Sequence, residues 1–231
     1  MSIVLITGGN KGIGRATATR LLELGHTVYI GARDQERGEA AAKEIGAQWL
    51  ALDVTGDASA VAAAAELAER EGHLDILVNN AGVTGAHATI DTLSAADMRA
   101  AFEVNVFGIV RVTQAFLPLL RRSQAPVIVN VSSLLGSFGA VGNPYGQQYE
   151  LFAPIYGASK SAVNMLTVQY AKELPGMRVN SVEPGYTATD LTGGHGLQTP
   201  EEAGANVARW ATIGPDGPTG IFAYKETIAP W

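Results

Sequence analysis

The alternation of two kinds of segment along the chain constrains the fold most strongly. Short runs of β-branched and apolar residues, such as Ile3–Thr7 and Val127–Val131, alternate with longer runs rich in Ala and Leu. A repeated strand–helix–strand order predicts parallel strands, because each right-handed crossover lays its helix over one face of the sheet. The sequence therefore predicts an α/β, doubly wound fold with helices on both faces of a parallel sheet.

The expected elements follow this alternation through the whole chain. Strands are expected at 3–7, 27–32, 48–52, 74–79, 127–131, 178–182 and 220–224. Helices are expected at 12–24, 35–45, 57–70, 95–122, 156–173 and 200–211, and Pro118 is expected to kink or end the long one. No linker or break in composition divides the chain, so residues 1–231 are expected to form a single domain. Segments 134–155 and 185–199 lack regular periodicity and follow strands, where ligands of such sheets bind.

Composition excludes several classes of function. The formal net charge of -6 argues against nucleic-acid and anionic-membrane binding, which need a positive field. The chain has no Cys, and its four His are scattered, so we expect no disulfide and no metal site. No apolar stretch approaches the roughly 20 residues that span a bilayer. We expect a soluble, cytoplasmic protein.

A glycine-rich loop lies between the first expected strand and the first expected helix. Its sequence is Thr7-Gly8-Gly9-Asn10-Lys11-Gly12-Ile13-Gly14. Glycines at 8, 12 and 14 let the backbone turn sharply and approach a pyrophosphate, which the free N–H groups of the following helix favour. The strand–loop–helix context is the one that such a motif requires. An ordinary glycine-rich turn is the alternative interpretation.

The end of the second expected strand indicates which dinucleotide binds. An acidic residue there would bind the adenosine ribose hydroxyls and repel a 2′-phosphate. Ala32 stands at that place, Arg33 follows it, and Lys11 and Asn10 of the loop can converge on the same point. Two cations without a carboxylate favour a 2′-phosphate, so we expect NADP(H). A ribose contact from Asp34 stays open, and surface charge is the alternative for Arg33 and Lys11.

A set of polar residues indicates acid–base chemistry. Tyr156 and Lys160 stand four residues apart on an expected helix and share one face. An ammonium about 5 Å from the phenol would lower the tyrosine pKa by about 2 units and tune it for proton exchange with an alcohol or alkoxide. A hydroxyl from Ser132 or Ser133 can stabilise charge on the same oxygen. Each residue, Asn105 included, has an ordinary structural alternative, but all of them and the glycine loop project toward one end of the sheet.

These motifs, in this order, resemble the short-chain dehydrogenase/reductase family. The matching residues are Thr7-Gly8-x-x-x-Gly12-Ile13-Gly14, Asn79-Asn80-Ala81-Gly82, Asn105, Ser133, Tyr156-Gly-Ala-Ser-Lys160 and Pro184-Gly185. The resemblance implies a Rossmann fold of seven parallel strands in the order 3-2-1-4-5-6-7 and a catalytic tetrad of Asn105, Ser133, Tyr156 and Lys160. Tyr156 would be the acid/base, Lys160 would also hold the nicotinamide ribose, and Asn105 would anchor a proton-relay water.

The resemblance also implies the remaining cofactor contacts. Asp53 and Val54 would edge the adenine, Asn79 would support the ribose side, and Thr187 and Thr189 would bracket the nicotinamide amide and the pyrophosphate. The expected cofactor-binding residues are Gly8, Asn10, Lys11, Gly12, Ile13, Gly14, Arg33, Asp53, Val54, Asn79, Ala81, Gly82, Tyr156, Lys160, Pro184, Gly185, Thr187 and Thr189. The single domain would then bind the dinucleotide and carry the catalytic groups.

Three features resemble the NADPH-dependent carbonyl reductases of that family. They are the 9–12 loop with Ala32-Arg33-Asp34, the tail from Thr199 to Trp231, and an insert at about 142–154 before Tyr156. Pro144 and Pro154 indicate that the insert is not one continuous helix. We expect it to line the substrate pocket through Tyr145, Tyr149, Leu151 and Phe152. It could also cover the helix face through which relatives associate, which would leave a monomer instead of a homodimer or homotetramer.

The segment 186–199 is expected to form a mobile lid that begins at Tyr186. An apolar, aromatic lining favours a neutral hydrophobic ketone or aldehyde, so the leading hypothesis is an enzyme that reduces such a carbonyl with NADPH. One alternative is a reductase of a carrier-bound 3-oxoacyl chain, with Arg121 and Arg122 as the candidate carrier contacts. The other is a non-catalytic NADP(H) sensor, which would not need a complete tetrad.

Overall fold

A computed structural model describes residues 1–231 and contains one eight-stranded sheet in the order β3-β2-β1-β4-β5-β6-β7-β8. Every neighbouring pair from β3 to β7 is parallel. The strands are β1 (Ile3–Thr7), β2 (Thr27–Ala32), β3 (Gln48–Ala51), β4 (Ile76–Asn79), β5 (Val127–Val131), β6 (Arg178–Glu183), β7 (Phe222–Tyr224) and β8 (Thr227–Ile228). The seven parallel strands and their order confirm the expected Rossmann fold.

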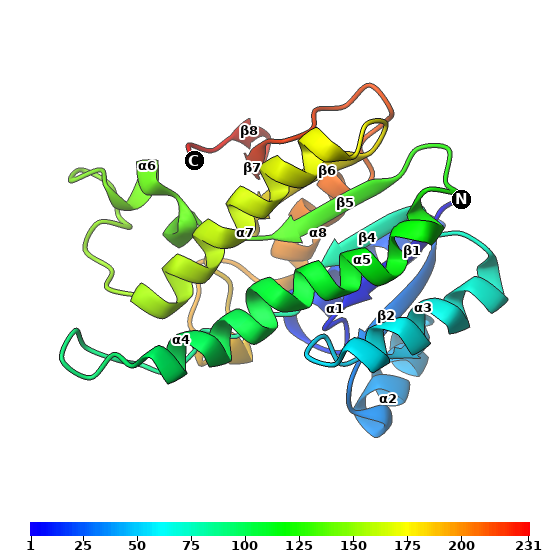
Figure 1. Cartoon of the computed structure of the whole chain (residues 1–231), viewed down its shortest axis with the longest axis horizontal. Coiled ribbons are helices and arrows are strands. Elements are labelled where there is room, and N and C mark those ends of the chain that lie inside the picture. The colour runs from blue at the N-terminus through cyan, green and yellow to red at the C-terminus, as the bar shows by residue number, and fades with distance from the viewer.

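Helices cover both faces of the sheet (Figure 1). On one face lie α1 (Gly12–Glu23), α2 (Gln35–Ile45) and α8 (Pro200–Ala211). On the other face lie α3 (Asp57–Glu71), α4 (Ala95–Phe102), α5 (Gly108–Leu120) and α7 (Pro154–Glu173). Short helical segments follow α4, β5 and β6. They are η1 (Glu103–Phe107) after α4, η2 (Leu134–Gly136) with α6 (Phe138–Val141) after β5, and η3 (Asp190–Thr192) after β6.

The two hydrophobic cores follow from the alternation of side chains along each strand. In β1, Val4 and Ile6 enter the core under α1, α2 and α8, whereas Ile3 and Leu5 enter the core under α3 and α5. Successive side chains of a strand point to opposite faces, so a continuous apolar run fills both cores. This arrangement leaves the polar residues at the ends of the strands free for a site.

The eighth strand corrects the expectation of seven. β8 pairs antiparallel with β7 across a tight turn at Lys225 and Glu226, where Lys225 has a φ of 52°. Such hairpin turns are usually marked by Gly or Asn, and this one carries neither. A two-residue strand without a turn signal leaves no pattern in the sequence.

The long helix expected at 95–122 is interrupted at its centre. α4 passes into η1, a single π-helical turn that contains Asn105, and then into α5. Pro118 lies inside α5, which ends two residues later. By length and composition the stretch Ala95–Leu120 could cross a membrane, contrary to the expectation from the sequence. Its apolar residues Phe116 and Leu120 are completely buried on the sheet, so the core accounts for its hydrophobicity.

The chain ends beside the segment that follows β5. The amide of Gly139 donates to the carbonyl of Trp231 (2.7 Å), and the Ser137 hydroxyl donates to the carbonyl of Pro230 (2.7 Å). The Trp231 ring stacks on Phe222 at 5.9 Å between centroids. The neighbouring insert at 142–154 follows α6 and forms a series of turns, and Pro154 begins α7, so the insert is not one continuous helix, as its prolines predicted.

Candidate active site

The residues expected to carry function gather at the carboxyl ends of the parallel strands. The glycine loop follows β1, residues 79–82 end and follow β4, Ser133 follows β5, and Pro184-Gly185 follow β6. The amide N–H groups of Asn80 and Ala81 both donate to the Thr7 hydroxyl at 3.0 Å, which joins the segment after β4 to the glycine loop. One edge of the sheet therefore carries both the loop and the catalytic candidates.

The glycine loop has the geometry of an anion site. Gly8 and Gly12 have φ values of 63° and 54°, a conformation that favours glycine. No side chain caps the start of α1, and its first turn has no acidic residue. By contrast, Asp34 caps α2, Ser94 caps α4 and Thr199 caps α8. The uncapped N–H groups and the positive end of α1 fit the pyrophosphate of a dinucleotide.

The charged residues near the end of β2 have different surroundings. The Arg33 side chain is exposed, and its charge helps to lower the pKa of Asp53. The carboxylate of Asp34 accepts the Arg37 amide at 3.0 Å and so belongs to the α2 cap. Lys11 donates to Asp190 of η3 at 2.9 Å, and both side chains are largely exposed. Arg33 is thus the cation at this point without an ion-pair partner.

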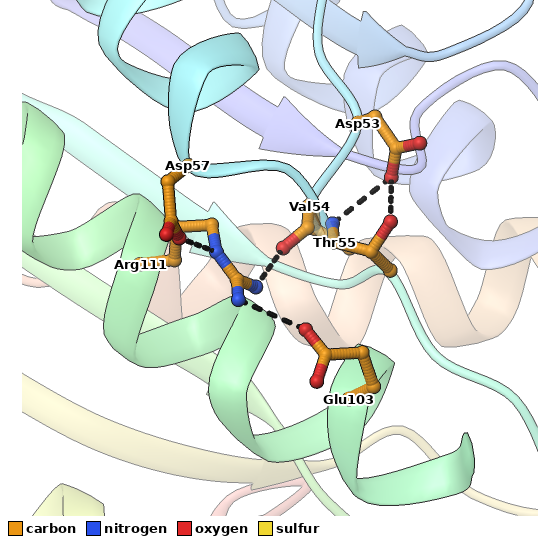
Figure 2. Close-up of polar contacts among 6 residues, drawn as sticks. All are labelled: Asp53, Val54, Thr55, Asp57, Glu103 and Arg111. Atoms are coloured by element: carbon orange, nitrogen blue, oxygen red, sulfur yellow. Dashed lines mark hydrogen bonds and ion pairs between the residues drawn. The ribbon is translucent and has the colours of Figure 1, made fainter.

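The loop between β3 and α3 is held by an arginine of α5 (Figure 2). Asp53 accepts both the amide (2.9 Å) and the hydroxyl (2.7 Å) of Thr55, which lowers the pKa of Asp53. Arg111 donates to the carbonyl of Val54 at 2.6 Å. Asp53 and Val54, the expected adenine contacts, therefore have fixed positions in the structure.

Asn79 and Gly82, two of the expected cofactor-binding residues, lie in different surroundings. The Asn79 side chain is buried, and its amide nitrogen donates to Asn130 at 2.9 Å and to Thr113 at 3.3 Å, so it links β4 to β5 and to α5. The Asn79 Oδ1 accepts no hydrogen bond from the protein. Gly82 lies beside the catalytic candidates, because a Cβ on it would stand 3.6 Å from Lys160 Nζ and 3.4 Å from Asn105 Oδ1. Because Gly82 has no side chain, the space beside Lys160 and Asn105 stays open.

Tyr156 and Lys160 face each other on the first turns of α7. Lys160 is buried, its Nζ donates to the carbonyl of Val131 at 2.7 Å, and it lies 5.5 Å from the centre of the Tyr156 ring. Ser133 follows β5 at the same place, and its hydroxyl interacts with the Tyr156 phenol. Its neighbour Ser132 is fully buried and donates to Asn164 at 2.6 Å. This geometry leaves Ser133 as the serine beside the tyrosine.

The Tyr156 pKa corrects one expectation from the sequence. Loss of solvent raises the Tyr156 pKa well above its ordinary value, and the Glu183 charge raises it further, while Ser133 lowers it. Burial lowers the Lys160 pKa to about 8, against the opposing effect of Glu183. Without a second positive charge, the lysine does not offset the burial of the phenol. In this structure the raised pKa keeps the phenol in its protonated form at neutral pH.

Glu183 belongs to this centre, although no motif points to it. It is the last residue of β6, is 6% exposed, and accepts the amides of Leu134 and of Gly185 (2.7 Å). Burial raises the Glu183 pKa, whereas these hydrogen bonds, Ser133 and Lys160 lower it. The one signal in the sequence is a carboxylate at the end of a buried strand, directly before Pro184-Gly185.

Asn105 is buried in the π-helical turn η1. Its side chain accepts the Val83 amide (2.8 Å) and donates to the Val83 carbonyl (2.8 Å) and to Ser159 (2.9 Å). These bonds join η1 to the segment after β4 and to α7, between Tyr156 and Lys160. Single π turns often occur at functional sites, and here one brings three elements of the centre together.

The segment expected to form the lid lies over the glycine loop. A Cβ on Gly12 would stand 3.5 Å from Thr189 Cγ2, and the Thr187 hydroxyl donates to the Gly185 carbonyl at 2.8 Å. The expected substrate contacts Tyr145, Tyr149, Phe152 and Tyr186 are all more than half exposed, and Tyr145 is 96% exposed. The structure thus places them on the surface rather than in an enclosed pocket.

Known proteins resemble this chain over most of its length. The family model of the short chain dehydrogenases matches residues 2–199. Short-chain dehydrogenase anuI of Penicillium roqueforti is 40% identical over 92% of this chain and 89% of its own length. The NADPH-dependent pterin aldehyde reductase of Arabidopsis thaliana is 38% identical over 81% of this chain and 76% of its own.

A solved structure gives the same result. The NADPH-bound carbonyl reductase from chicken fatty liver superimposes with a TM-score of 0.85 and 30% identity, covering 100% of this chain and 99% of that one. The matched family model spans the glycine loop, the tyrosine–lysine pair and the segment after β6. This chain therefore belongs to the short-chain dehydrogenase/reductase family, whose members are oxidoreductases that use a nicotinamide cofactor.

Proposed function

We propose that the protein is an NADPH-dependent reductase that converts a neutral, hydrophobic ketone or aldehyde into an alcohol, in the cytoplasm. The observation that carries the proposal is the group formed by buried Lys160 and part-buried Tyr156 and Ser133, at the edge that also holds the glycine loop. A carbonyl oxygen placed beside Tyr156 would meet a phenol and a serine hydroxyl. Asn105 supports this group from η1 through Ser159 and Val83.

Each residue of the group has a distinct part in the reduction. When bound, the cofactor supplies the hydride that reaches the carbonyl carbon. The Tyr156 phenol gives its proton to the oxygen as the carbon–oxygen double bond becomes a single bond. The Ser133 hydroxyl donates a hydrogen bond to that oxygen and stabilises its developing charge. Lys160, fixed by the Val131 carbonyl, stabilises the phenolate left by the proton transfer.

The electrostatics of the site suit proton donation to a carbonyl oxygen at neutral pH. The raised Tyr156 pKa keeps the phenol protonated, as a general acid must be before it acts. The Lys160 pKa of about 8 keeps most of the ammonium charged at pH 7. Both groups therefore start in the protonation states that carbonyl reduction needs.

NADP(H) is proposed over NAD(H) because of the residues after β2. Arg33 is exposed without an ion-pair partner, Ala32 offers no carboxylate, and Asp34 is engaged in the α2 cap. An arginine fork matches a phosphate, and no acid stands where it would repel one. The pterin aldehyde reductase and the chicken carbonyl reductase, which are named for NADPH or bound to it, support the same choice.

The two alternatives differ from this proposal in specific features. Arg121 and Arg122, the candidate carrier contacts, lie at the far end of α5, where Arg122 donates to the Gly72 carbonyl at 2.8 Å before β4 begins. They are therefore at the opposite edge of the sheet from Tyr156, which weakens the carrier hypothesis. A sensor would have no use for a complete tyrosine, lysine and serine group.

Separate measurements of NADPH and NADH oxidation test the proposal. The panel contains neutral aldehydes, α-diketones, aryl ketones and a β-ketoester without carrier. We expect turnover with NADPH and at least tenfold lower kcat/KM with NADH. Arg33→Ala should raise the KM for NADPH about tenfold and leave the KM for NADH within twofold, since two charge-assisted contacts to a phosphate are lost.

Arg20→Ala is the matched control, because Arg20 is also exposed but lies in the last turn of α1, away from the glycine loop. It should leave both KM values unchanged. Preference for NADH in the wild type would contradict the cofactor assignment, and tight NADPH binding without turnover on the whole panel would favour the carrier or sensor alternative.

A further inference from the structure

Arg111 of α5 holds three separate partners at once (Figure 2). Its guanidinium donates to the Val54 carbonyl (2.6 Å), to the Glu103 carboxylate (2.9 Å) and to Asp57. The Arg111 side chain is 17% exposed, whereas Asp57 and Glu103 are 87% and 41% exposed. The arginine thus joins the loop after β3, the start of α3 and the start of the π turn.

The same face of α5 admits the loop backbone at close range. Gly108 lies one turn before Arg111, and a Cβ on Gly108 would stand 3.1 Å from Val54 Cβ. The absence of a side chain lets Val54 rest on the helix, and the guanidinium then fixes the direction of its carbonyl. Two residues of α5 therefore determine where Val54 stands.

The Asp53 carboxylate is oriented by the same turn. Thr55 donates its two hydrogen bonds to Oδ1 of Asp53. The Asp53 Oδ2 accepts no hydrogen bond from the protein and points away from Thr55 in Figure 2. The charges of Arg33 and Arg111 both help to keep Asp53 ionised. A loop with one free, ionised acceptor and a fixed backbone can receive the polar edge of a base.

We propose that Arg111 is a positioning residue for the adenine half of the cofactor, acting through Val54 and Asp53. This inference rests on the proposed function, because it places the adenine against those two residues. Arg111 contacts only this chain, so its effect on the cofactor passes through the loop. Loss of the guanidinium should therefore weaken adenine binding and leave the hydride-transfer end intact.

Cofactor fragments separate this role from that of a general structural brace. Adenosine 2′,5′-bisphosphate contains only the adenine half, and reduced nicotinamide mononucleotide contains only the nicotinamide half. In Arg111→Met, we expect the Kd values for NADPH and for adenosine 2′,5′-bisphosphate to rise at least tenfold. The kcat/KM with reduced nicotinamide mononucleotide as hydride donor should stay within twofold, as should kcat at saturating NADPH.

Two further variants keep the test decisive. Arg111→Lys retains the charge, but one ammonium cannot replace a fork that reaches both Val54 and Glu103, so we expect about threefold weaker adenine-half binding. Arg70→Met is the matched control, because Arg70 is an ion-paired arginine of α3 near the opposite edge of the sheet. It should change neither fragment's binding, and all variants should unfold within a few degrees of the wild type.

The outcomes distinguish the inference from the function beneath it. Equal weakening of both fragments in Arg111→Met would show a general brace and overturn the inference. Unchanged binding of adenosine 2′,5′-bisphosphate to an Arg111→Met variant as stable as the wild type would also overturn the inference. Turnover of that variant with NADPH would leave the proposed function intact. A wild type that binds neither NADPH nor adenosine 2′,5′-bisphosphate would overturn both.

Discussion

The start of α7 and the insert directly before it lie side by side in the sequence but differ in almost every physical respect. Lys160 is buried, its Nζ bonded to the Val131 carbonyl, and Tyr156 is surrounded by Ser133 and Glu183. In the insert, Tyr145 is 96% exposed and Phe152 is 63% exposed. The first region is fixed by contacts from β5, from β6 and from the π turn η1, whereas the second meets solvent with large apolar side chains.

We propose that this difference separates reactivity from selectivity. Proton transfer depends on distances and charges that only a packed region can hold constant. Substrate choice depends on apolar surface that can change without disturbing the core. The insert can therefore vary in length and composition, while the tyrosine centre keeps its geometry. Four variants test how complete the separation is.

The largest effect is expected for Tyr156→Phe. Removal of the hydroxyl takes away the proton donor, and general acids contribute about 10²–10⁴-fold to rate. We expect kcat to fall about 10³-fold with any substrate of the panel, while the Kd for NADPH, measured by fluorescence titration, stays within twofold. Substantial residual kcat would show that another group donates the proton.

Glu183→Gln should alter the pH dependence of kcat. The Glu183 charge raises the Lys160 pKa, which burial lowers to about 8. Activity that needs the ammonium is lost as pH rises through this pKa, so the alkaline limb of the wild type should lie near pH 8. Without the charge the Lys160 pKa falls, and the limb should move toward acid pH.

The matched control for that profile is Glu226→Gln, an exposed carboxylate paired with Arg209. Its profile should coincide with that of the wild type. An unchanged or upward-shifted limb in Glu183→Gln would mean that another group sets it. A shift would show that the residue before Pro184 belongs to the tyrosine centre and not only to the turn.

The insert should affect the substrate and nothing else. In the double variant Tyr145→Ala with Phe152→Ala, we expect the KM for an aryl ketone to rise about 3- to 10-fold, from lost apolar burial on binding. The KM for NADPH and the unfolding temperature should hardly change, because exposed side chains contribute little to stability. Val61→Ala, an exposed apolar residue of α3, is the control.

Size-exclusion chromatography of the same double variant addresses the other role considered for the insert. The insert leaves Phe107 of η1, Val110 of α5 and Met165 of α7 exposed, so it does not cover these helices. An unchanged KM for the ketone together with a changed oligomeric state would show that the insert contacts another subunit rather than the substrate.

The smallest effect is expected for Asp190→Asn. The Lys11–Asp190 pair joins the glycine loop to the lid segment, but both side chains are exposed, and such pairs contribute about 0–1 kcal/mol. We expect the KM for NADPH to change less than twofold, in the direction of tighter binding, because Lys11 becomes free for a phosphate. A change above fivefold would show that the pair controls access to the site.

The sequence predicted the packed region well and the exposed region poorly, for physical reasons. Strand periodicity arises from local packing, as at Val4 in the core. The glycine loop arises from backbone geometry, as at Gly8 and Gly12 with their positive φ values. The π turn around Asn105 leaves no local signal, because it depends on contacts with Val83 and Ser159. Glu183 and Arg111 were likewise hidden, since their partners lie far away in the chain.

The tyrosine pKa shows the same limit. The spacing of Tyr156 and Lys160 correctly brings them together, but the direction of the Tyr156 pKa depends on burial and on Glu183, which spacing does not reveal. Similarly, the two-residue β8 and the turn at Lys225 are too short for any periodicity. Local patterns give the elements, and long-range charge and burial decide how the site behaves.

Trp49 and Trp231 are natural fluorescent reporters near the carboxyl ends of the parallel strands. Trp49 donates to the Ala32 carbonyl at 3.2 Å, beside the end of β2, whereas Trp231 stacks on Phe222 and bonds the segment after Ser133. Indole emission changes with its surroundings, so a variant that keeps only Trp49 would follow events near the adenosine end. A variant that keeps only Trp231 would follow those near the substrate, without any attached dye.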